Sequence, residues 1–146
     1  MKKIDTPVEL SRYEPQKNDL HVQQRFRTNA IWDTGASGTV ITENVVRELK
    51  LFPTGVATVS TASETNVRRP TYSIKLHLTA EFTVTLPKVV LGIITDDIDC
   101  LIGMDVIGDG DFCISNFQNK TCMSFRYPSQ HVIDYMENPH LIVSTK

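Results

Sequence analysis

Hydrophobic and polar residues alternate along much of the chain, which is the pattern of strands with one buried face. Residues 20–26 alternate in this way, and the apolar run "NAIW" at residues 29–32 is a second expected strand that leads into Asp33. Four later stretches are rich in β-branched residues: "VATVSTA", "TYSIKLHLT", "FTVTL" and "VVLGII". The middle two predict a hairpin that turns at residues 80–81, and "FCIS" and "TCMSF" predict another around "NFQNK". The pattern therefore predicts a mainly β fold.

Two segments instead show the helical spacing of apolar residues. In "TENVVRELKLFPTG", Thr42 stands at the cap position, Glu43 lies in the first turn, and Pro53 follows the expected end. In "SQHVIDYMEN", Ser129 takes the cap position of a C-terminal helix over residues 129–137. The apolar face of that second helix consists of Val132, Ile133 and Met136.

The length and composition fit one domain with a polar extension at each end. The chain has 146 residues, of which 40% are hydrophobic and 22% are charged. Residues 1–19 are polar, contain Pro7 and Pro15, and show no sustained period, so we expect an arm that lies on the surface or is partly disordered. Residues 20–127 form the expected domain, and residues 128–146 form the expected C-terminal helix and tail.

The charge and hydropathy of the chain bound its partners and its location. The formal net charge is −2, which leaves no basic surplus for gripping phosphates, so nucleic acid is an unexpected partner. No apolar run approaches the roughly 18 residues of a membrane span, and the two N-terminal lysines precede no apolar signal segment. We therefore expect no membrane partner and a cytoplasmic location.

The cysteine and histidine positions do not predict a metal site. Cys100, Cys113 and Cys122 are odd in number and lack CxxC spacing, so we expect buried reduced thiols, and four scattered histidines add no ligand set. Residues 105–116 echo a calcium loop, but Ile107 and Asn116 stand where two oxygen ligands are required. The preferred interpretation of residues 103–111 is a short helix with a solvated acidic end.

The stretch "IWDTGASGTVIT" places the ionisable Asp33 between apolar residues and a glycine turn. A carboxylate in such a place is expected to be partly buried and to need a partner, but Asp-Thr-Gly is also good turn chemistry, so Asp33 could simply cap its own loop. A serine hydrolase is excluded, because Thr39 stands where the second glycine of a G-x-S-x-G elbow should be. For Trp32, packing in the core is the simplest interpretation, with a contribution to a dimer contact as the alternative.

The order of these motifs resembles the retropepsin-like aspartic peptidases, the single-domain family that includes retroviral proteases. An apolar strand leads into Asp33-Thr34-Gly35-Ala36, and a helix and a long hairpin precede Leu101-Ile102-Gly103. The resemblance covers roughly residues 20–127 and looks closest to bacterial members, which commonly continue with Gly-Met-Asp, as at residues 103–105 here. It implies a closed β-barrel with one or two short helices and an aspartic endopeptidase that uses no metal and no cofactor.

Two departures from the retroviral pattern affect the candidate site. Retroviral members often pair an aspartate and an arginine at the positions of Ser37 and Met104, and both residues have changed together here, which avoids stranding a buried charge. The family's flap is usually a glycine-rich hairpin, whereas the matching stretch "TVSTASETNVRRPTY" contains no glycine. The expected flap therefore departs from the glycine-rich pattern of the family.

The chemistry requires two carboxylates, and the chain supplies one Asp-Thr-Gly motif. Hydrolysis of an amide by water needs a base and an acid, and two carboxylates that share one proton can serve as both. The second carboxylate must then be Asp33 of another copy across a two-fold axis, so we expect a homodimer that acts on a peptide or protein substrate. A catalytically silent module for dimerisation or peptide binding is the alternative, and it is favoured if the glycine-free flap holds a peptide without closing.

The resemblance also assigns expected roles around Asp33. Thr34 would bond across the dimer axis, Gly35 would leave room for a peptide backbone, and Ala36 and Ser37 would line the cleft. Leu101, Ile102 and Gly103 would support the catalytic loop. The expected flap tip consists of Ala62, Ser63, Glu64 and Thr65.

Overall fold

The computed structural model describes residues 4–15, 23–95 and 97–140. The chain divides into two compact units, Met1–Gly108 and Asp109–Lys146. This division differs from the expected domain over residues 20–127, because the first unit takes in the N-terminal strand and the second begins before the last hairpin. Leu20 and Val22, part of the first alternating stretch, lie outside the described residues.

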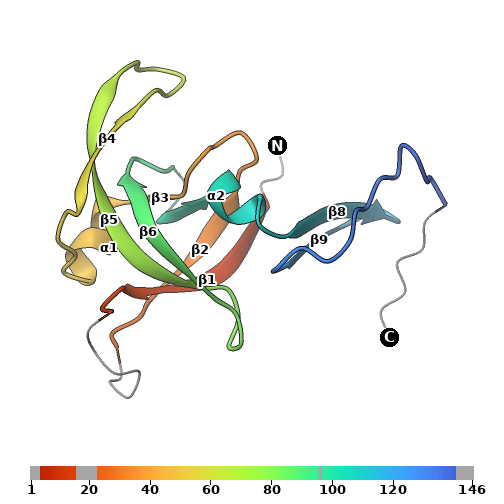
Figure 1. Ribbon diagram of the computed structural model, residues 1–146, viewed down its shortest axis with the longest axis horizontal. Helices are drawn as coiled ribbons and strands as arrows, with labels where there is room; N and C mark the ends of the chain where they lie inside the picture. The colour runs from red at the N-terminus through yellow and green to blue at the C-terminus, as the bar shows by residue number, and fades with distance from the viewer. Residues whose placement is uncertain (1–3, 16–22, 96, 141–146) are drawn as a thin grey trace. The chain divides into compact units, whose positions relative to one another are not determined.

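The first unit is a closed β-barrel with two short helices among its described residues (Figure 1). Its sheet runs in the order β1-β2-β7-β3-β6-β5-β4. A further pairing of β1 with β5 closes the first six of these strands into a ring, and β4 pairs with β5 outside that ring. The expected mainly β barrel is therefore confirmed. The strands are β1 (Asp5–Arg12), β2 (Phe26–Trp32), β3 (Val40–Ile41), β4 (Gly55–Val59), β5 (Val67–His77), β6 (Thr83–Leu91) and β7 (Cys100–Ile102), and the helices are α1 (Glu43–Glu48) and α2 (Met104–Ile107).

The β5–β6 hairpin supplies much of the barrel core. Ile74 pairs with Leu86 and Leu76 pairs with Val84, as the alternation of apolar residues on either side of the turn predicts. The largest fully buried side chains also come from the other strands and from α1, so the core fills the barrel from all sides. They include Leu10, Ile41, Val45, Leu49, Ile74, Leu76, Val89 and Ile102.

The expected surface arm over residues 1–19 is wrong for β1, which is a barrel strand paired with both β2 and β5. Val8 and Leu10 are buried, although Pro7 interrupts their alternation. The carbonyl of Ile4 accepts a hydrogen bond from the Trp32 N–H at 3.0 Å, so every second residue from Ile4 turns its backbone groups toward β2. Pro7 therefore turns its nitrogen to the other side, where the missing N–H costs no bond in the β1–β2 ladder.

The helix α1 begins after Thr42 as expected, but the Thr42 side chain makes no capping bond. Its hydroxyl donates to the Asp99 carboxylate at 2.5 Å instead. Val45 and Val46 are buried against the barrel, which stabilises a helix too short to persist alone. The carbonyl of Thr42 still accepts the first helical bond, from the Val46 N–H at 3.3 Å.

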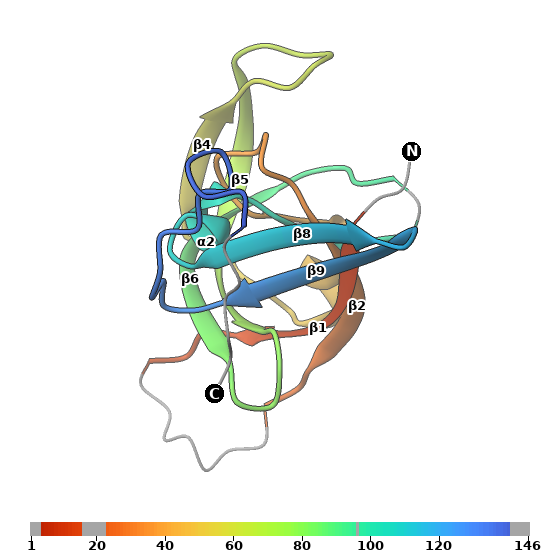
Figure 2. The same cartoon turned by 90° about the vertical axis from the view of Figure 1, so that its right-hand side faces the viewer.

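The second unit contains the predicted hairpin, made of β8 (Asp111–Phe117) and β9 (Lys120–Arg126), which run side by side in Figure 2. Its turn uses Gln118 and Asn119 at φ of 50° and 60°, the left-handed conformation that such tight turns require. The Asp111 carboxylate accepts hydrogen bonds from the Ser129 hydroxyl and the Gln130 N–H. These bonds and the Arg126 guanidinium hold the pKa of Asp111 well below its usual range.

The expected C-terminal helix over residues 129–137 is wrong. Ser129, the expected cap, donates its hydroxyl to Asp111, and residues 129–134 have no helical structure. Only one turn forms, where the Asp134 carboxylate accepts the N–H groups of Met136 and Glu137 at 2.9 and 3.1 Å. The side chains of Val132 and Met136 are 92% and 94% exposed, so no packing supports a longer helix.

The three cysteines are all free thiols, but only part of the expectation of buried thiols holds. Cys100 on β7 is buried, Cys113 is half-buried, and Cys122 on β9 is exposed. Burial raises the pKa of Cys100 to about 12, which favours the neutral thiol. No helix in the described ranges has the length and apolar character needed to span a membrane.

Candidate active site

Asp33 lies directly after β2, where the chain leaves the barrel wall. β2 runs parallel to β7, with Trp32 opposite Ile102, and the Asp33 N–H donates to the Ile102 carbonyl at 2.9 Å. Two segments about seventy residues apart in the sequence therefore end side by side. The structure brings the Asp33 loop and the Leu101-Ile102-Gly103 stretch together, as the resemblance implies.

The Asp33 loop is folded around its own carboxylate. The Gly35 N–H donates to Asp33 Oδ1 at 2.8 Å, and the Ala36 N–H donates to the Asp33 carbonyl at 3.3 Å. A Cβ at Gly35 would lie 3.1 Å from Asp33 Oδ1, so a larger residue would crowd this oxygen. The loop-capping bond is thus present. Asp33 is half-buried, and Thr34, Gly35 and Ser37 are exposed.

Gly103 lets the two segments touch backbone to backbone. A Cβ at this position would lie 2.6 Å from the Gly38 carbonyl group and 2.9 Å from the Ala36 oxygen. The next residue, Met104, donates its N–H to the Ala36 carbonyl at 2.8 Å. Glycine is therefore required at position 103 by the close packing of the Asp33 loop, and not by an unusual backbone conformation.

Asp105 holds the far end of the same loop, a role that the sequence analysis missed. Its carboxylate accepts the backbone N–H of Thr39 at 2.9 Å and the Thr39 hydroxyl at 2.8 Å. The hydroxyl in turn accepts the Gly103 N–H at 3.3 Å, and Thr39 is fully buried. We refer to Asp105, Thr39 and Gly103 as the loop clamp. The expected solvated acidic end after the helix holds for Asp109, which is exposed, but is wrong for Asp111, whose side chain is 11% exposed and bonds to Ser129 and Gln130.

Ser37 and Met104 do not rebuild the charged pair that retroviral members often have at these positions. Ser37 is exposed, and the Met104 side chain is 41% exposed at the start of α2. The loop clamp joins the same two segments, the Asp33 loop and the start of α2, through a carboxylate and a buried threonine. In this clamp, Thr39 lies two residues after Ser37 in the loop, and Asp105 lies one residue after Met104 in α2.

The expected flap residues lie at the tip of the β4–β5 hairpin, which extends beyond the barrel in Figure 1. The Thr61 N–H donates to the Glu64 carbonyl at 2.7 Å, the Glu64 N–H donates to the Thr61 hydroxyl at 3.1 Å, and residues 62–65 are exposed. Asn66 adopts φ of 57°, the left-handed conformation that asparagine tolerates better than most residues. Asn66 thus supplies a left-handed position just before β5 without a glycine.

Trp32 packs in the core beside the loop, in agreement with the simplest interpretation of its position. Its side chain is 8% exposed, and its indole N–H donates to the Thr6 hydroxyl on β1 at 2.9 Å. Among the described residues no group of three histidine, cysteine, aspartate or glutamate side chains is placed to hold a metal ion.

The chain is similar to several proteins of known structure. The chain is similar to the foamy viral protease–reverse transcriptase in complex with an RNA/DNA hybrid, with 24% identity, a TM-score of 0.46 and coverage of 73% of this chain but only 12% of that one. It is also similar to the EIAV protease complexed with the inhibitor HBY-793, with 17% identity, a TM-score of 0.45 and coverage of 74% and 88%. A retropepsin-like aspartic protease from Rickettsia conorii gives 15% identity, a TM-score of 0.45 and coverage of 79% and 89%.

The comparison of sequences identifies the family more directly. None of the curated proteins matches the chain. A family model described as aspartyl protease matches residues 19–106, which is more than half of the chain and includes both the Asp33 loop and Asp105. The chain therefore belongs to the aspartyl protease family.

Proposed function

We propose that the chain is an aspartic endopeptidase that works as a homodimer, with Asp33 of each copy facing Asp33 of the other. The observation that carries this proposal is the single Asp-Thr-Gly loop, fixed between β2 and β7 and exposed at Thr34 and Gly35. A second copy that meets this exposed loop would supply the second carboxylate. Two carboxylates in contact share one proton, as in other aspartic proteases, and such a pair titrates as a unit.

In this proposal the shared proton and a bound water carry out the reaction. The ionised carboxylate takes a proton from the water as it attacks the peptide carbonyl, and the protonated carboxyl stabilises the developing charge and supplies a proton toward the leaving nitrogen. The water adds its oxygen to the carbonyl carbon, and the C–N bond then breaks. The two carboxyl groups end the cycle with one proton between them, as they began it.

The neighbouring residues take the roles that the resemblance implies. Thr34 bonds across the dimer axis, the Gly35 backbone lies against the substrate backbone, and Ala36 and Ser37 line the cleft. The exposed tip at residues 62–65 closes over an extended peptide as an added strand edge. Leu101, Ile102 and Gly103 hold the loop in place from behind, through the bonds at Ile102 and Met104. The proposed enzyme uses no cofactor or metal and acts in the cytoplasm.

The test is cleavage of a diverse peptide mixture, read by mass spectrometry from about pH 4 to 8, by the wild type and by Asp33→Asn. We expect wild-type cleavage with a defined side-chain preference and no cleavage by the variant. Both samples are first shown to be folded by circular dichroism. If both folded proteins are silent across the pH range, the endopeptidase proposal is wrong and the silent binding module takes its place.

A further inference from the structure

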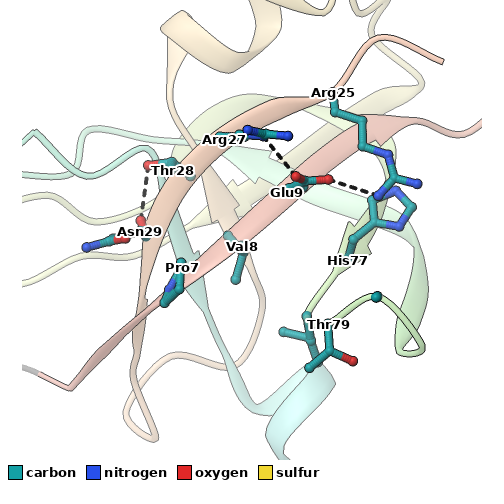
Figure 3. A pocket seen from close by; sticks show the side chains of 11 residues that line it. Pro7, Val8, Glu9, Arg25, Arg27, Thr28, Asn29, His77 and Thr79 are labelled. Carbon is teal, nitrogen blue, oxygen red and sulfur yellow. Dashed lines mark hydrogen bonds and ion pairs between the residues drawn. The ribbon is translucent and has the colours of Figure 1, made fainter. Parts of the chain in front are cut away.

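An open cavity of about 870 Å³, shown in Figure 3, lies at the barrel surface. Its walls come from β1, from the start of β2 and from the turn that joins β5 to β6. No residue from 33 to 39 or from 101 to 105 lines it. Cavities of this size accommodate a ligand as large as a short peptide segment.

The cavity exists because the barrel is incompletely paired on this side. β5 pairs with β1 only from Glu9 to Arg12, and the chain then turns away at Leu78 into the β5–β6 turn. The preceding part of β1 therefore has an edge that β5 does not cover. Pro7 lies in the middle of this edge with its nitrogen turned outward, and without an N–H it cannot template a full added strand. A ligand here must be recognised largely through side chains.

The side chains that line the cavity carry a net positive charge. The Glu9 carboxylate accepts one N–H from Arg25 and one from Arg27, both at 2.9 Å, so two guanidinium groups flank a single carboxylate (Figure 3). Each guanidinium has five N–H donors, and its contact with Glu9 uses one. Among the described residues that line the cavity, two arginines therefore stand against one carboxylate, which gives this lining a net positive charge on a chain whose net charge is −2.

The two arginines share one carboxylate partner and remain open to solvent. Glu9 contacts both guanidinium groups from β1, and the side chains of Arg25 and Arg27 are 47% and 84% exposed, so an incoming anion can reach them and competes with Glu9 for them. His77 lies beside Arg25 in Figure 3, and its pKa is lowered by burial and by the charge of Arg25. Pro7, Leu78 and Ala80 add apolar surface to the lining of the cavity.

We propose that this cavity binds an acidic peptide segment, with a carboxylate against Arg25 and Arg27 and a neighbouring apolar side chain against Pro7 and Leu78. Guanidinium groups bind carboxylates through paired, charge-assisted hydrogen bonds, so an acidic side chain is favoured over a neutral amide of the same shape. The site goes beyond the proposed peptidase function, because it is separate from the Asp33 loop and requires no catalysis.

The test measures binding by fluorescence anisotropy in the Asp33→Asn protein, which cannot cleave the probe if the proposed function is right. The probe is a fluorescein-labelled peptide of about eight residues with alternating glutamate and leucine, of which a few neighbouring residues at a time can occupy the cavity. Matched peptides with glutamine or lysine in place of glutamate serve as controls. We expect the glutamate peptide to bind about tenfold more tightly than the glutamine peptide, and its affinity to fall with added salt.

Variants of the cavity then separate charge recognition from structural damage. Arg25→Gln with Arg27→Gln leaves Glu9 alone and should weaken the glutamate peptide by at least about tenfold. Glu9→Gln removes the competing carboxylate and should strengthen binding severalfold, an opposite change that a merely damaged fold would not give. Arg47→Gln with Lys50→Gln, in and just after α1, removes two positive charges at exposed positions that do not line the cavity and should leave the affinity unchanged.

Several outcomes would overturn the proposal. They are equal affinity for the glutamate and glutamine peptides, no loss in the double arginine variant, or weaker binding in Glu9→Gln. If sedimentation instead shows a self-association that the double arginine variant abolishes, a second copy occupies the cavity and the acidic peptide does not. Failure here leaves the peptidase proposal intact, since cleavage is measured separately with the wild type.

Discussion

The Asp105 carboxylate binds both the backbone N–H and the hydroxyl of Thr39, a residue 66 positions away in the chain. Both donors point at oxygens, so the contact needs two acceptors on one side chain. A carboxylate provides them, whereas an amide provides one acceptor and one donor. Because Thr39 is buried and Asp33 stands six residues before it, this contact fixes the exit of the candidate catalytic loop.

Asp105→Asn should therefore destabilise the protein and reduce activity. In one orientation the NH2 group of the amide faces the Thr39 N–H. In the other it faces the Thr39 hydroxyl and changes the bond that this hydroxyl accepts from the Gly103 N–H. We expect a loss of about 1–3 kcal/mol in the free energy of unfolding by urea and a lower kcat for peptide cleavage, with the fall in kcat persisting at temperatures where the variant is folded.

The matched control for this prediction is Asp109→Asn, which makes the same substitution at an exposed position four residues later. It should change stability by less than about 0.5 kcal/mol. A second pair at Thr39 tests the hydroxyl: Thr39→Ser should retain most of the stability, and Thr39→Val should lose it. Equal behaviour of Asp105→Asn and Asp109→Asn would show that the loop clamp contributes nothing.

Acid should weaken the barrel through His77. The pKa of this side chain is lowered, first by burial and then by the charges of Arg25 and Lys75, with Glu9 acting in the opposite direction. The unfolded chain therefore binds a proton at a higher pH than the folded chain, so the stability that neutral His77 contributes is present above about pH 6.5 and is lost as the pH falls below it.

The measurement is the free energy of urea unfolding at pH 7.5, 6.5 and 5.5 for the wild type, His77→Gln and the exposed-site control His131→Gln, a range that spans the usual histidine pKa of about 6.5. We expect the wild type and His131→Gln to lose stability in parallel on acidification, and His77→Gln to lose less. Parallel loss in all three proteins would assign the acid sensitivity to other groups.

Asn66 should govern the rigidity of the flap hairpin. Its φ of 57° costs asparagine and glycine little, but it costs alanine about 1 kcal/mol. Asn66→Ala should therefore speed amide hydrogen exchange at Val59 and Val67, which are paired beside the tip, while Asn66→Gly should not. Thr65→Ala, at the exposed neighbouring position, is the control. Equal exchange in the alanine and glycine variants would exclude backbone strain as the controlling factor.

Local patterns predicted the parts of the fold that depend on nearby residues. The β5–β6 hairpin follows from alternation on both sides of one turn, and α1 follows from an apolar face between Thr42 and Pro53. β1 was missed because Pro7 and the charged residues around it hide its alternation, and its partners His77 and Ile31 are distant in the sequence. A barrel-closing strand depends on such distant pairings more than on its own pattern.

The candidate site likewise has one part that short sequence motifs predicted and another part that they did not. Asp33 and Gly103 could be singled out because each belongs to a short motif, and the structure brings their segments together. The contact between Asp105 and Thr39 could not be found from spacing, since it joins two ordinary residues through tertiary structure. The C-terminal helix failed for a similar reason, because its expected cap, Ser129, bonds to Asp111 in an earlier strand.

The most direct test of the central claim is to mix wild-type chains with Asp33→Asn chains and measure peptide cleavage. If each active site takes one Asp33 from each of two copies, a roughly ninefold excess of variant chains leaves only about one wild-type chain in ten with a wild-type partner. We predict that activity per wild-type chain falls to about a tenth, and that dilution of the wild type lowers its specific activity. Activity that is unchanged by the excess of folded Asp33→Asn chains would show that one chain suffices, and it would contradict the shared site.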